Sequence, residues 1–146
     1  MYTAFTVEQL RDFLVQVDHT FPIPLSQKQD LSDYARKLWE KATLCYELRD
    51  DRIISLVAGY TENVQNNIGY IAVVATLPEA RGQHLASLLV QRFIRICREH
   101  RLSAVHLYTT PDNHAAKRLY HRLGFVNWEL PDEPRPQDTH LILELE

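Results

Sequence analysis

The amino-acid sequence predicts an α+β fold of three layers: a mixed, mostly antiparallel central sheet with helices on both faces. Apolar residues recur with the period of a helix in several segments. Three consecutive apolar segments are separated by short turn sequences, as in antiparallel hairpins. A strand, a helix and a further strand then follow in succession, which allows a parallel crossover. With 146 residues and 45% hydrophobic composition, the chain is expected to form a single domain over residues 1–146.

The first half of the chain is expected to contain two helices and three strands. Val7–Val17 has helical spacing, with Thr6 as its N-cap, and the prolines of residues 21–24 interrupt the helix. A second helix is expected from about Leu31 to Ala42, capped by Asp30 or Ser32. Three strands follow, joined by turns at residues 50–51 and 65–67, and the third strand, residues 68–77, ends at a proline.

The second half alternates helices with strands. Apolar residues line one face of a helix over residues 85–99, and residues 104–109 form a short strand that can lie parallel to the 68–77 strand. Residues 111–113 cap a further helix, which Gly124 ends in a left-handed conformation. Leu141, Leu143 and Leu145 alternate in a closing strand over residues 139–145.

Charge divides the chain into three blocks. Residues 79–122 carry 8 basic and 3 acidic side chains, whereas residues 1–78 have a net charge of −3 and residues 123–146 one of −5. An anionic ligand is therefore expected at the middle block. The basic residues of that block lack interleaved aromatic side chains and the whole chain has a net charge of −3, so nucleic acid is not an expected partner.

Composition argues against other classes of protein as well. No run approaches the ~18 apolar residues of a membrane span, and residues 1–5 lack a basic segment followed by an apolar one, so no signal peptide is expected. Cys45 and Cys97 are expected to be buried and reduced in a cytoplasmic protein. His114 and His121 lie two helical turns apart, too far for adjacent ligands, so no metal site is expected.

The loop between the 68–77 strand and the following helix has the properties of a phosphate site. It contains Arg81 and Gly82, and small residues at a helix start leave backbone N–H groups unpaired where the helix dipole favours negative charge. The loop has neither the Gly-Lys-Ser/Thr of a P-loop nor the Gly-x-Gly of a dinucleotide site. Taken alone, it fits a structural turn as well as a ligand cradle.

A second stretch shifts that balance towards the cradle. It has the pattern Asn-x-x-Ala-x-x-x-Tyr-x-x-x-Gly-Phe, formed by Asn113, Ala116, Tyr120, Gly124 and Phe125. Together with Ala75-Thr76-Leu77-Pro78 and the loop from Arg81 to Ala86, in that order and spacing, it resembles the GCN5-related N-acetyltransferase (GNAT) family over about residues 44–126. The resemblance implies a sheet whose 68–77 and 104–109 strands splay apart.

The resemblance further implies that acetyl-CoA is the cosubstrate and enters the wedge between those strands. A backbone N–H would stabilise the oxyanion, and the amine would attack the thioester directly. Tyr120 is the implied catalytic residue, which protonates the departing thiolate because the pKa of a phenol lies close to that of a thiol. The residues implied to bind acetyl-CoA are Val74, Ala75, Thr76, Arg81, Gly82, Gln83, His84, Leu85, Ala86, Asn113, Ala116 and Tyr120.

Two positions depart from the family pattern. His84 replaces a loop glycine, and its side chain would either crowd the pyrophosphate or donate a hydrogen bond to it. Tyr108 stands where many relatives have a glutamate as general base. His106 lies on the same strand face but is interpreted as a packed or surface residue. Glu47 and Glu62 are further candidates, and no general base is assigned.

The preferred function is acetylation of a primary amine in a small molecule, such as an amino sugar or an amino-acid derivative. The acidic N-terminal block and the loop at residues 21–26 would form an acceptor wall suited to a cationic amine. Residues 128–138 would cover the site or contact a second subunit, as in a homodimer. The aromatic residues available to stack on the acceptor are Phe21, Tyr34, Trp39 and Tyr46.

Two alternatives stay open. One is a protein or peptide N-acetyltransferase, which shares the acetyl donor and the direct attack. The other is a binding module that senses acyl-CoA without turnover, which the missing loop glycine and the missing glutamate favour.

Overall fold

A six-stranded sheet forms the centre of the protein in the computed structural model, which describes residues 5–62 and 64–145. Residues 1–4, on which the expectation of no signal peptide partly rests, lie outside the described residues. The strands lie in the order β1-β2-β3-β4-β6-β5. They are β1 (Thr43–Arg49), β2 (Arg52–Tyr60), β3 (Ile68–Thr76), β4 (Ala104–Thr109), β5 (Val126–Asn127) and β6 (Thr139–Glu144).

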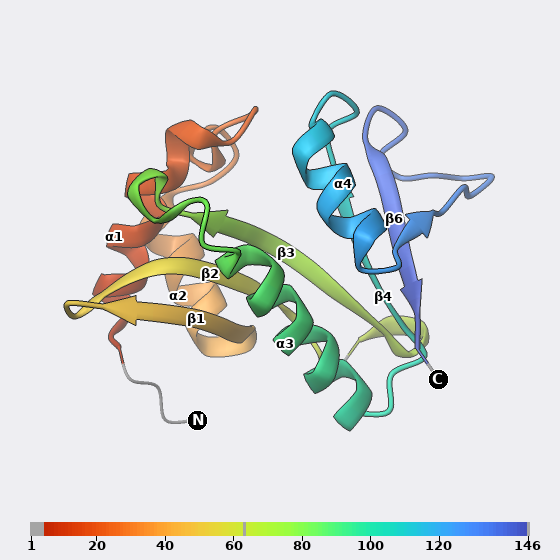
Figure 1. Ribbon diagram of the computed structural model, residues 1–146, viewed down its shortest axis with the longest axis horizontal. Helices are drawn as coiled ribbons and strands as arrows, with labels where there is room; N and C mark the ends of the chain where they lie inside the picture. Colours follow the sequence, from red (N-terminus) through yellow and green to blue (C-terminus); the bar gives the residue numbers. More distant parts are fainter. Residues whose placement is uncertain (1–4, 63, 146) are drawn as a thin grey trace.

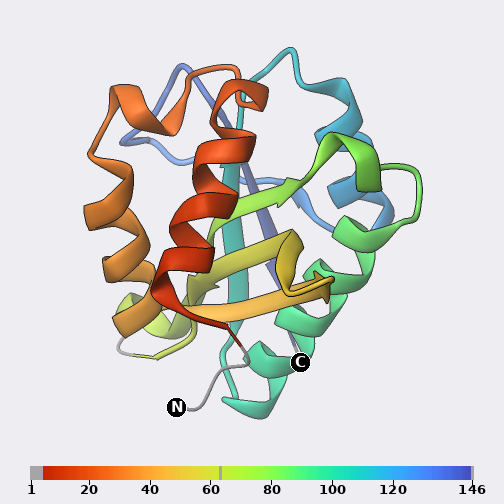
Figure 2. The ribbon, with the colours of Figure 1, turned by 90° about the vertical axis from the view of Figure 1, so that its left-hand side faces the viewer.

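Four helices cover the two faces of this sheet. One layer consists of α1 (Val7–Val17) and α2 (Leu31–Lys41), and the other of α3 (Leu85–Glu99) and α4 (His114–Arg122). Figures 1 and 2 show the sheet between the two layers. The predicted α+β fold with helices on both faces is confirmed. Within the described part of the chain, no helix is long and apolar enough to cross a membrane.

The helix ends follow from local chemistry. Thr6 accepts a hydrogen bond from the N–H of Gln9, whose side chain accepts one from the N–H of Thr6, so the two form a capping box. Asp30, not Ser32, caps α2. Gly124 follows α4 with φ +105°, in the left-handed region, as predicted from the sequence.

Each helix layer has its own apolar core. Leu10, Phe13 and Leu38 are buried between the first layer and the sheet, and Phe93 and Phe125 between the second layer and the sheet. Burying each such side chain contributes about 1.5–3 kcal/mol relative to leaving it exposed. Each core fixes one helix layer to the sheet, and the candidate functional site lies where the sheet opens.

The sheet opens between β3 and β4. These strands pair in parallel only from Ile68 to Tyr70, opposite Ala104 to His106, whereas β4 pairs with β6 over all six of its residues. The edge of β3 that faces β4 is therefore unpaired from residue 71 to residue 76. The predicted splay is confirmed in this way.

A bulge in β3, with Ala72 as its extra residue, lies beside the point of separation. The register between β2 and β3 shifts between Ala58 and Gly59, and Gly59 pairs with Ile71, the first residue of β3 beyond the parallel pairing. A Cβ atom at Gly59 would collide with the backbone oxygen of Tyr70 and the ring of Phe93, so only glycine allows this close approach. Bulges bend and twist a strand, and this one turns β3 away from β4.

The sequence analysis missed one strand. β5 has only two residues, both exposed, so it has too few apolar residues for an alternating pattern to be recognised. It pairs with β6 at Ile142 and Leu141. This pairing anchors one end of the connection over residues 128–138, which reaches the functional site.

Candidate active site

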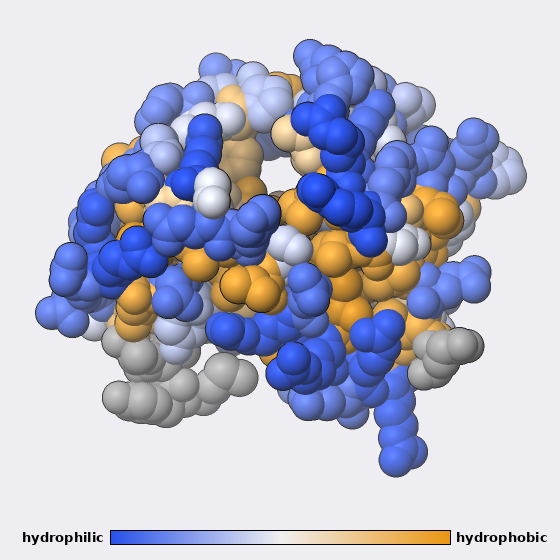
Figure 3. All heavy atoms as spheres, viewed as in Figure 1, coloured by the Kyte–Doolittle hydropathy of each residue, from blue (hydrophilic) through white to orange (hydrophobic). Residues whose placement is uncertain are grey.

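The wedge between β3 and β4 holds a pocket of about 400 Å³. Figure 3 shows it as a hollow between α4 and the segments around α1 and α2, with apolar atoms at its rim. Its walls come from parts of the chain that are far apart in sequence. They are the α1–α2 connection, residues 71–74 of β3, residues 107–110 at the end of β4, α4, and the β5–β6 connection.

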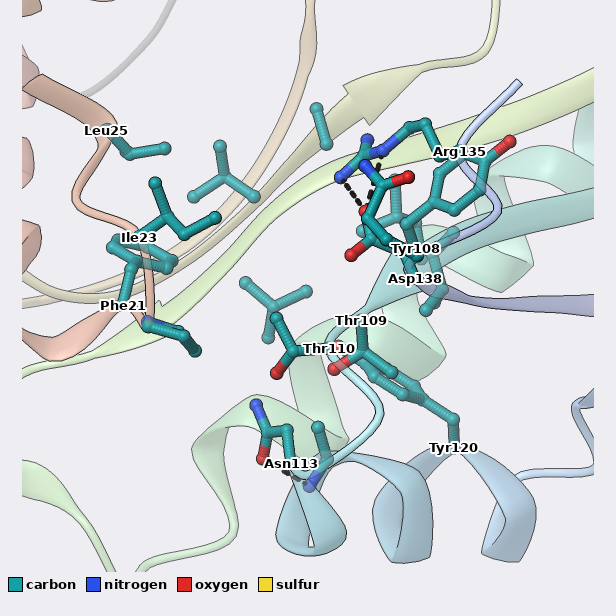
Figure 4. A pocket seen from close by; sticks show the side chains of 18 of the residues that line it. Phe21, Ile23, Leu25, Tyr108, Thr109, Thr110, Asn113, Tyr120, Arg135 and Asp138 are labelled. Carbon is teal, nitrogen blue, oxygen red and sulfur yellow. Dashed lines mark hydrogen bonds and ion pairs between the residues drawn. The ribbon is translucent and has the colours of Figure 1, made fainter. Parts of the chain in front are cut away.

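On one side of the pocket, α4 provides two of the predicted residues. Asn113 caps α4, its Oδ1 accepting from the N–H of Ala116 at 3.2 Å, and its Nδ2 has no hydrogen-bond partner among the described residues. Tyr120 is 5% exposed and reaches the pocket from the same helix (Figure 4). Of the predicted site residues, Val74, Asn113, Ala116 and Tyr120 thus line one pocket.

The hydroxyl of Tyr120 forms no hydrogen bond within the described residues. Burial raises the pKa of Tyr120 well above that of an exposed tyrosine, and therefore further from the pKa of a thiol than the sequence analysis expected. The phenol therefore carries its proton at neutral pH. It can donate a hydrogen bond, and finally that proton, to negative charge that develops on an atom beside it.

Thr110 is a polar residue of the pocket that the sequence analysis missed. Its Oγ1 is the one fully buried side-chain oxygen or nitrogen, over residues 5–62 and 64–145, that has no hydrogen-bond partner. Figure 4 shows Thr110 between Asn113 and Tyr120. A buried hydroxyl without a partner costs about 1–3 kcal/mol, which a hydrogen bond to a ligand in the pocket would recover.

The loop from Arg81 to Ala86 lies outside this pocket, at the start of α3. No backbone carbonyl or capping side chain of the described residues accepts a hydrogen bond from the N–H groups of residues 82–87. These groups, with the positive end of the helix dipole, suit the phosphates of a nucleotide. Gly82, at φ +84°, and His84, at φ +59°, are both in the left-handed region.

The conformation of His84 explains why a glycine suits this position. Its imidazole is exposed and makes no capping hydrogen bond to α3. The cost of His84 is the left-handed backbone itself, about 1–2 kcal/mol for a residue other than glycine.

The remaining predicted residues are placed along β3. Ala75 pairs with Leu56 and Thr76 with Ser55 of β2, so the backbone of this segment is held on its far side. The hydroxyl groups of Thr76 and Ser55 are 2.8 Å apart and share a hydrogen bond. This leaves the opposite backbone edge, towards β4, free to pair with an extended ligand.

The opposite wall of the pocket differs from the expected acidic one. Its N-terminal part consists of Phe21, Pro22, Ile23 and Leu25, with Lys28 at the rim. Its one carboxylate, that of Asp138, is 2.7 Å from the Arg135 guanidinium and is neutralised by it. The acidic residues counted in the sequence lie elsewhere because the helices around this loop turn their charged faces to solvent.

Most of the aromatic residues proposed to stack on the acceptor are also placed elsewhere. Trp39 and Tyr46 pack edge-on against Phe5 in the core beneath α1 and α2. Tyr34 is partly buried against the same core, and only Phe21 lines the pocket. Sequence alone could not distinguish these residues, because which aromatic ring faces the pocket depends on how α1 and α2 pack against the sheet.

The β5–β6 connection supplies a carboxylate beside the position where many relatives have their general base. Glu133 Oε2 accepts from the Tyr108 hydroxyl at 2.8 Å, and its Oε1 lies 2.6 Å from His140 Nδ1. The Arg135 guanidinium stacks on the Tyr108 ring, 4.3 Å from its centroid. Residues 128–138 therefore cover the site, one of the two roles expected for them.

Glu133 is ionised in this arrangement. Burial opposes its charge, but hydrogen bonds from the N–H of Arg135, from Tyr108 and from His140 outweigh burial and lower its pKa to about 2. The pKa of Tyr108 is raised to about 12 by burial and by its hydrogen bond to this carboxylate. Neither Glu47 nor Glu62, the other candidates from the sequence, lines the pocket.

The two cysteines are not nucleophiles. Cys45 and Cys97 are both buried and free. Burial raises the pKa of Cys45 to about 11 and that of Cys97 to about 12, so both are protonated thiols at neutral pH. A direct transfer without a covalent acyl-enzyme is consistent with this chemistry.

Comparison with known protein families agrees with this geometry. The profile of the Acetyltransferase (GNAT) family matches residues 9–125, most of the chain. The chain belongs to this family. Acetyl-CoA is the acetyl donor of GNAT enzymes, as the sequence analysis expected.

Individual relatives match shorter stretches of this GNAT chain. Mycothiol acetyltransferase of Paenarthrobacter aurescens is 44% identical over 62 residues, 42% of this chain and 19% of that protein. N-alpha-acetyltransferase 30 of Schizosaccharomyces pombe is 38% identical over 61 residues, 42% of this chain and 41% of that protein. The chain thus spans less than half the length of these curated relatives.

A solved structure supports the GNAT fold over the whole chain. The acetyltransferase of GNAT family from Staphylococcus aureus Mu50 has a TM-score of 0.78 and 16% sequence identity, and the alignment covers 99% of this chain and 96% of that one. At this identity the likeness concerns the fold. The acceptor of the present GNAT chain has to be inferred from its own residues.

Proposed function

We propose that the protein transfers the acetyl group of acetyl-CoA to the primary amine of a small molecule that has an apolar body and a carboxylate, as an apolar amino acid does. The observation that carries this proposal is the end of the parallel pairing at Tyr70 and His106. Beyond it, one pocket joins the unpaired edge of β3 and Tyr120 to the apolar wall of the α1–α2 connection.

Backbone groups form most of the proposed binding site for acetyl-CoA. The free edge of β3 at residues 74–76 suits the amides of a pantetheine arm, and the N–H groups of residues 82–87 suit the pyrophosphate. A backbone N–H of β3 would hold the oxyanion that forms when the amine attacks the thioester carbonyl. Tyr120 would then give its proton to the CoA thiolate, and Thr110 and Asn113 would hydrogen-bond the bound donor.

The residues on the acceptor side of the pocket indicate which chemical class of amine would bind there. Phe21, Ile23 and Leu25 offer apolar surface to a side chain. Lys28 is the one cationic lining residue without a carboxylate partner among the described residues, while Asp138 is already neutralised by Arg135. A polyamine or an amino sugar would find no free carboxylate here, whereas an acceptor carboxylate would find the ammonium of Lys28.

The match to N-alpha-acetyltransferase 30 favours a second candidate, the terminal amine of a peptide. The two candidates differ in one group. A free amino acid has a carboxylate next to its amine, whereas a peptide has an amide there. Lys28 would therefore contribute to the binding of the first acceptor and not of the second.

The experiment starts with calorimetric titration of acetyl-CoA, with ATP as control, followed by kcat/KM for leucine, leucinamide, a leucine-initiated peptide, glucosamine and spermidine. We expect micromolar binding of acetyl-CoA and at least tenfold preference for leucine over the other amines. Lys28→Met is expected to reduce kcat/KM for leucine about tenfold and leave leucinamide unchanged. Lys37→Met, at an exposed position of α2 outside the pocket, is the matched control.

Each other outcome rejects a defined part of the proposal. Higher kcat/KM for the peptide than for leucine favours the peptide enzyme, and a preference for spermidine or glucosamine rejects the anionic acceptor. Binding of acetyl-CoA without acetylation of any amine favours the module that binds acyl-CoA without turnover. Absence of acetyl-CoA binding at millimolar concentration, weaker than about −4 kcal/mol, rejects the acetyltransferase itself.

A further inference from the structure

A chain of hydrogen-bonded ionisable side chains lies next to the pocket, and the proposed function does not yet use it. Glu133 Oε1 is 2.6 Å from His140 Nδ1, and His140 Nε2 is 2.7 Å from His106 Nδ1. His140 is 6% exposed and Glu133 is largely covered, so the chain is shielded from bulk water over most of its length. It runs from the β5–β6 connection through β6 to β4.

The ionised carboxylate determines the position of each proton along this chain. Glu133 can only accept, so a neutral His140 carries its hydrogen on Nδ1 and leaves Nε2 as an acceptor. His106 must then donate from its own Nδ1, which leaves His106 Nε2 with a free lone pair. That nitrogen has no hydrogen-bond partner among the described residues, and it is not among their fully buried, unpartnered side-chain atoms.

His106 lies at the closed end of the wedge, next to the pocket and not among its lining residues. His106 pairs with Tyr70 in the last parallel pair before β3 and β4 separate. Tyr108, two residues further along the same strand face, already lines the pocket. Two residues along a strand span about 6.6 Å, so a proton path from an amine beside Tyr108 to His106 Nε2 runs through water and not through a direct hydrogen bond.

We propose that His106 is the proton acceptor for the attacking amine, with His140 and Glu133 as positioning residues that hold its tautomer. The inference rests on the proposed acetyl transfer. As the amine nitrogen forms its bond to the acetyl carbon, it becomes positively charged, and one of its protons passes through the water to His106 Nε2. The carbon–sulfur bond then breaks, its electron pair stays on sulfur, and Tyr120 protonates the thiolate. Solvent restores the proton of Tyr120 and removes that of His106.

The surroundings of His106 keep its ring neutral, as a proton acceptor must be. Its ring contacts Tyr70 of β3, Tyr108 of β4, His140 of β6 and Trp128 of the β5–β6 connection, and Arg135 is stacked on Tyr108. Burial and the neighbouring His140 lower the pKa of His106 to about 4, while Glu133 opposes this, so at pH 7 the ring is neutral and able to accept. The positively charged nitrogen of the tetrahedral adduct is more acidic than a free ammonium group, so a base this weak accepts its proton from the adduct and not from a free ammonium group. The amine must therefore arrive neutral.

The first test does not depend on activity. Nitrogen NMR of the histidine-labelled protein at pH 7 is expected to show His106 and His140 both with hydrogen on Nδ1. Glu133→Gln, which places an amide N–H group or a neutral carbonyl against His140, is expected to change the tautomer of at least one of the two rings. His106 with its hydrogen on Nε2 in the wild-type protein would overturn the proposal.

The second test concerns the reaction. His106→Ala is expected to lower kcat at least 100-fold, the usual range for loss of a general base, with unchanged acetyl-CoA binding and partial rescue by added imidazole. His106→Gln serves as a second variant of similar volume, and His100→Ala, exposed beyond the end of α3, is the control. An active wild type whose kcat survives both substitutions within twofold overturns the role of His106 alone. A wild type that acetylates no amine rejects the proposed function and the role of His106 with it, whatever the tautomers.

Discussion

The two sides of the proposed site are built in different ways. The proposed donor side consists of short contiguous stretches, the loop before α3 outside the pocket and the first two turns of α4 beside it, whose exposed backbone groups and caps are set by local residues. The acceptor side joins the α1–α2 connection to the β5–β6 connection, two segments from opposite ends of the chain. A change on the donor side should therefore affect every amine equally. A change on the acceptor side should alter which amine is used.

The largest effect is expected for Tyr120→Phe on the donor side. Loss of the proton donor should lower kcat about 100-fold or more for every amine, with the dissociation constant of acetyl-CoA unchanged. The melting temperature should stay within a degree or two, because the hydroxyl has no hydrogen bond to lose in the free protein. Tyr34→Phe, outside the pocket, is the control. A loss confined to one class of amine would place Tyr120 on the acceptor side instead.

Arg135→Met should affect the acceptor side without reducing donor binding. It removes the partner of Asp138 and the cation over the Tyr108 ring, so a free carboxylate then faces the pocket. The ratio of kcat/KM for spermidine to that for leucine is expected to rise roughly tenfold, about 1.4 kcal/mol of discrimination. Arg52→Met, which breaks the exposed pair with Glu79 away from the pocket, is the control and should leave the ratio unchanged.

Acid should lower the free energy of unfolding of the protein, through His106 first and Glu133 at lower pH. The folded-state pKa of His106 is about 4 against an ordinary 6.5, so the unfolded chain binds its proton first and stability falls as pH drops from 6.5 to 4. Glu133, with a pKa lowered from 4.5 to about 2, adds a loss between pH 4.5 and 2. Urea unfolding at pH 7, 5.5 and 4 measures this. His106→Gln should flatten the upper part of the curve, and an unchanged slope would contradict it.

The smallest effect is expected for His84→Gly. Relief of about 1–2 kcal/mol of left-handed strain, less the ~0.4–1 kcal/mol by which glycine favours the unfolded chain, should raise the free energy of unfolding by roughly 0.5–1 kcal/mol. Arg101→Gly, at φ +58° beyond the far end of α3, should give a similar gain. If the His84 imidazole contacts the phosphates of acetyl-CoA, His84→Gly will change the affinity for acetyl-CoA and Arg101→Gly will not. Equal affinities in both variants would show that the phosphates are bound by backbone groups without the imidazole.

Local chemistry made much of the fold predictable. Thr6 and Asp30 cap helices, Gly124 ends one, and three alternating apolar segments became three antiparallel strands. The turn at Asp50 and Asp51 has both residues at positive φ, as a tight hairpin needs. Asn113, Ala116 and Tyr120 were identified from the sequence because their motif resembles that of the GNAT family, and their spacing of three and four places them on one helix face.

The acceptor side could not be predicted in this way. An acidic count over residues 1–78 suggested an acidic wall, but which side chains face the pocket depends on how α1 and α2 dock on the sheet. Glu133 and His140 gave no sequence signal as partners of His106, since they lie 27 and 34 residues from it. Their hydrogen bonds exist only after β6 has paired with β4.

The sequence by itself determined the periodicities, the caps, the loop before α3 and the motif of α4, because each depends on interactions between residues a few positions apart. The tertiary structure alone decided where β3 leaves β4, which charges are neutralised, and which histidine nitrogen is left free. Those outcomes depend on the packing of segments distant in sequence, whose pairwise energies no local pattern records.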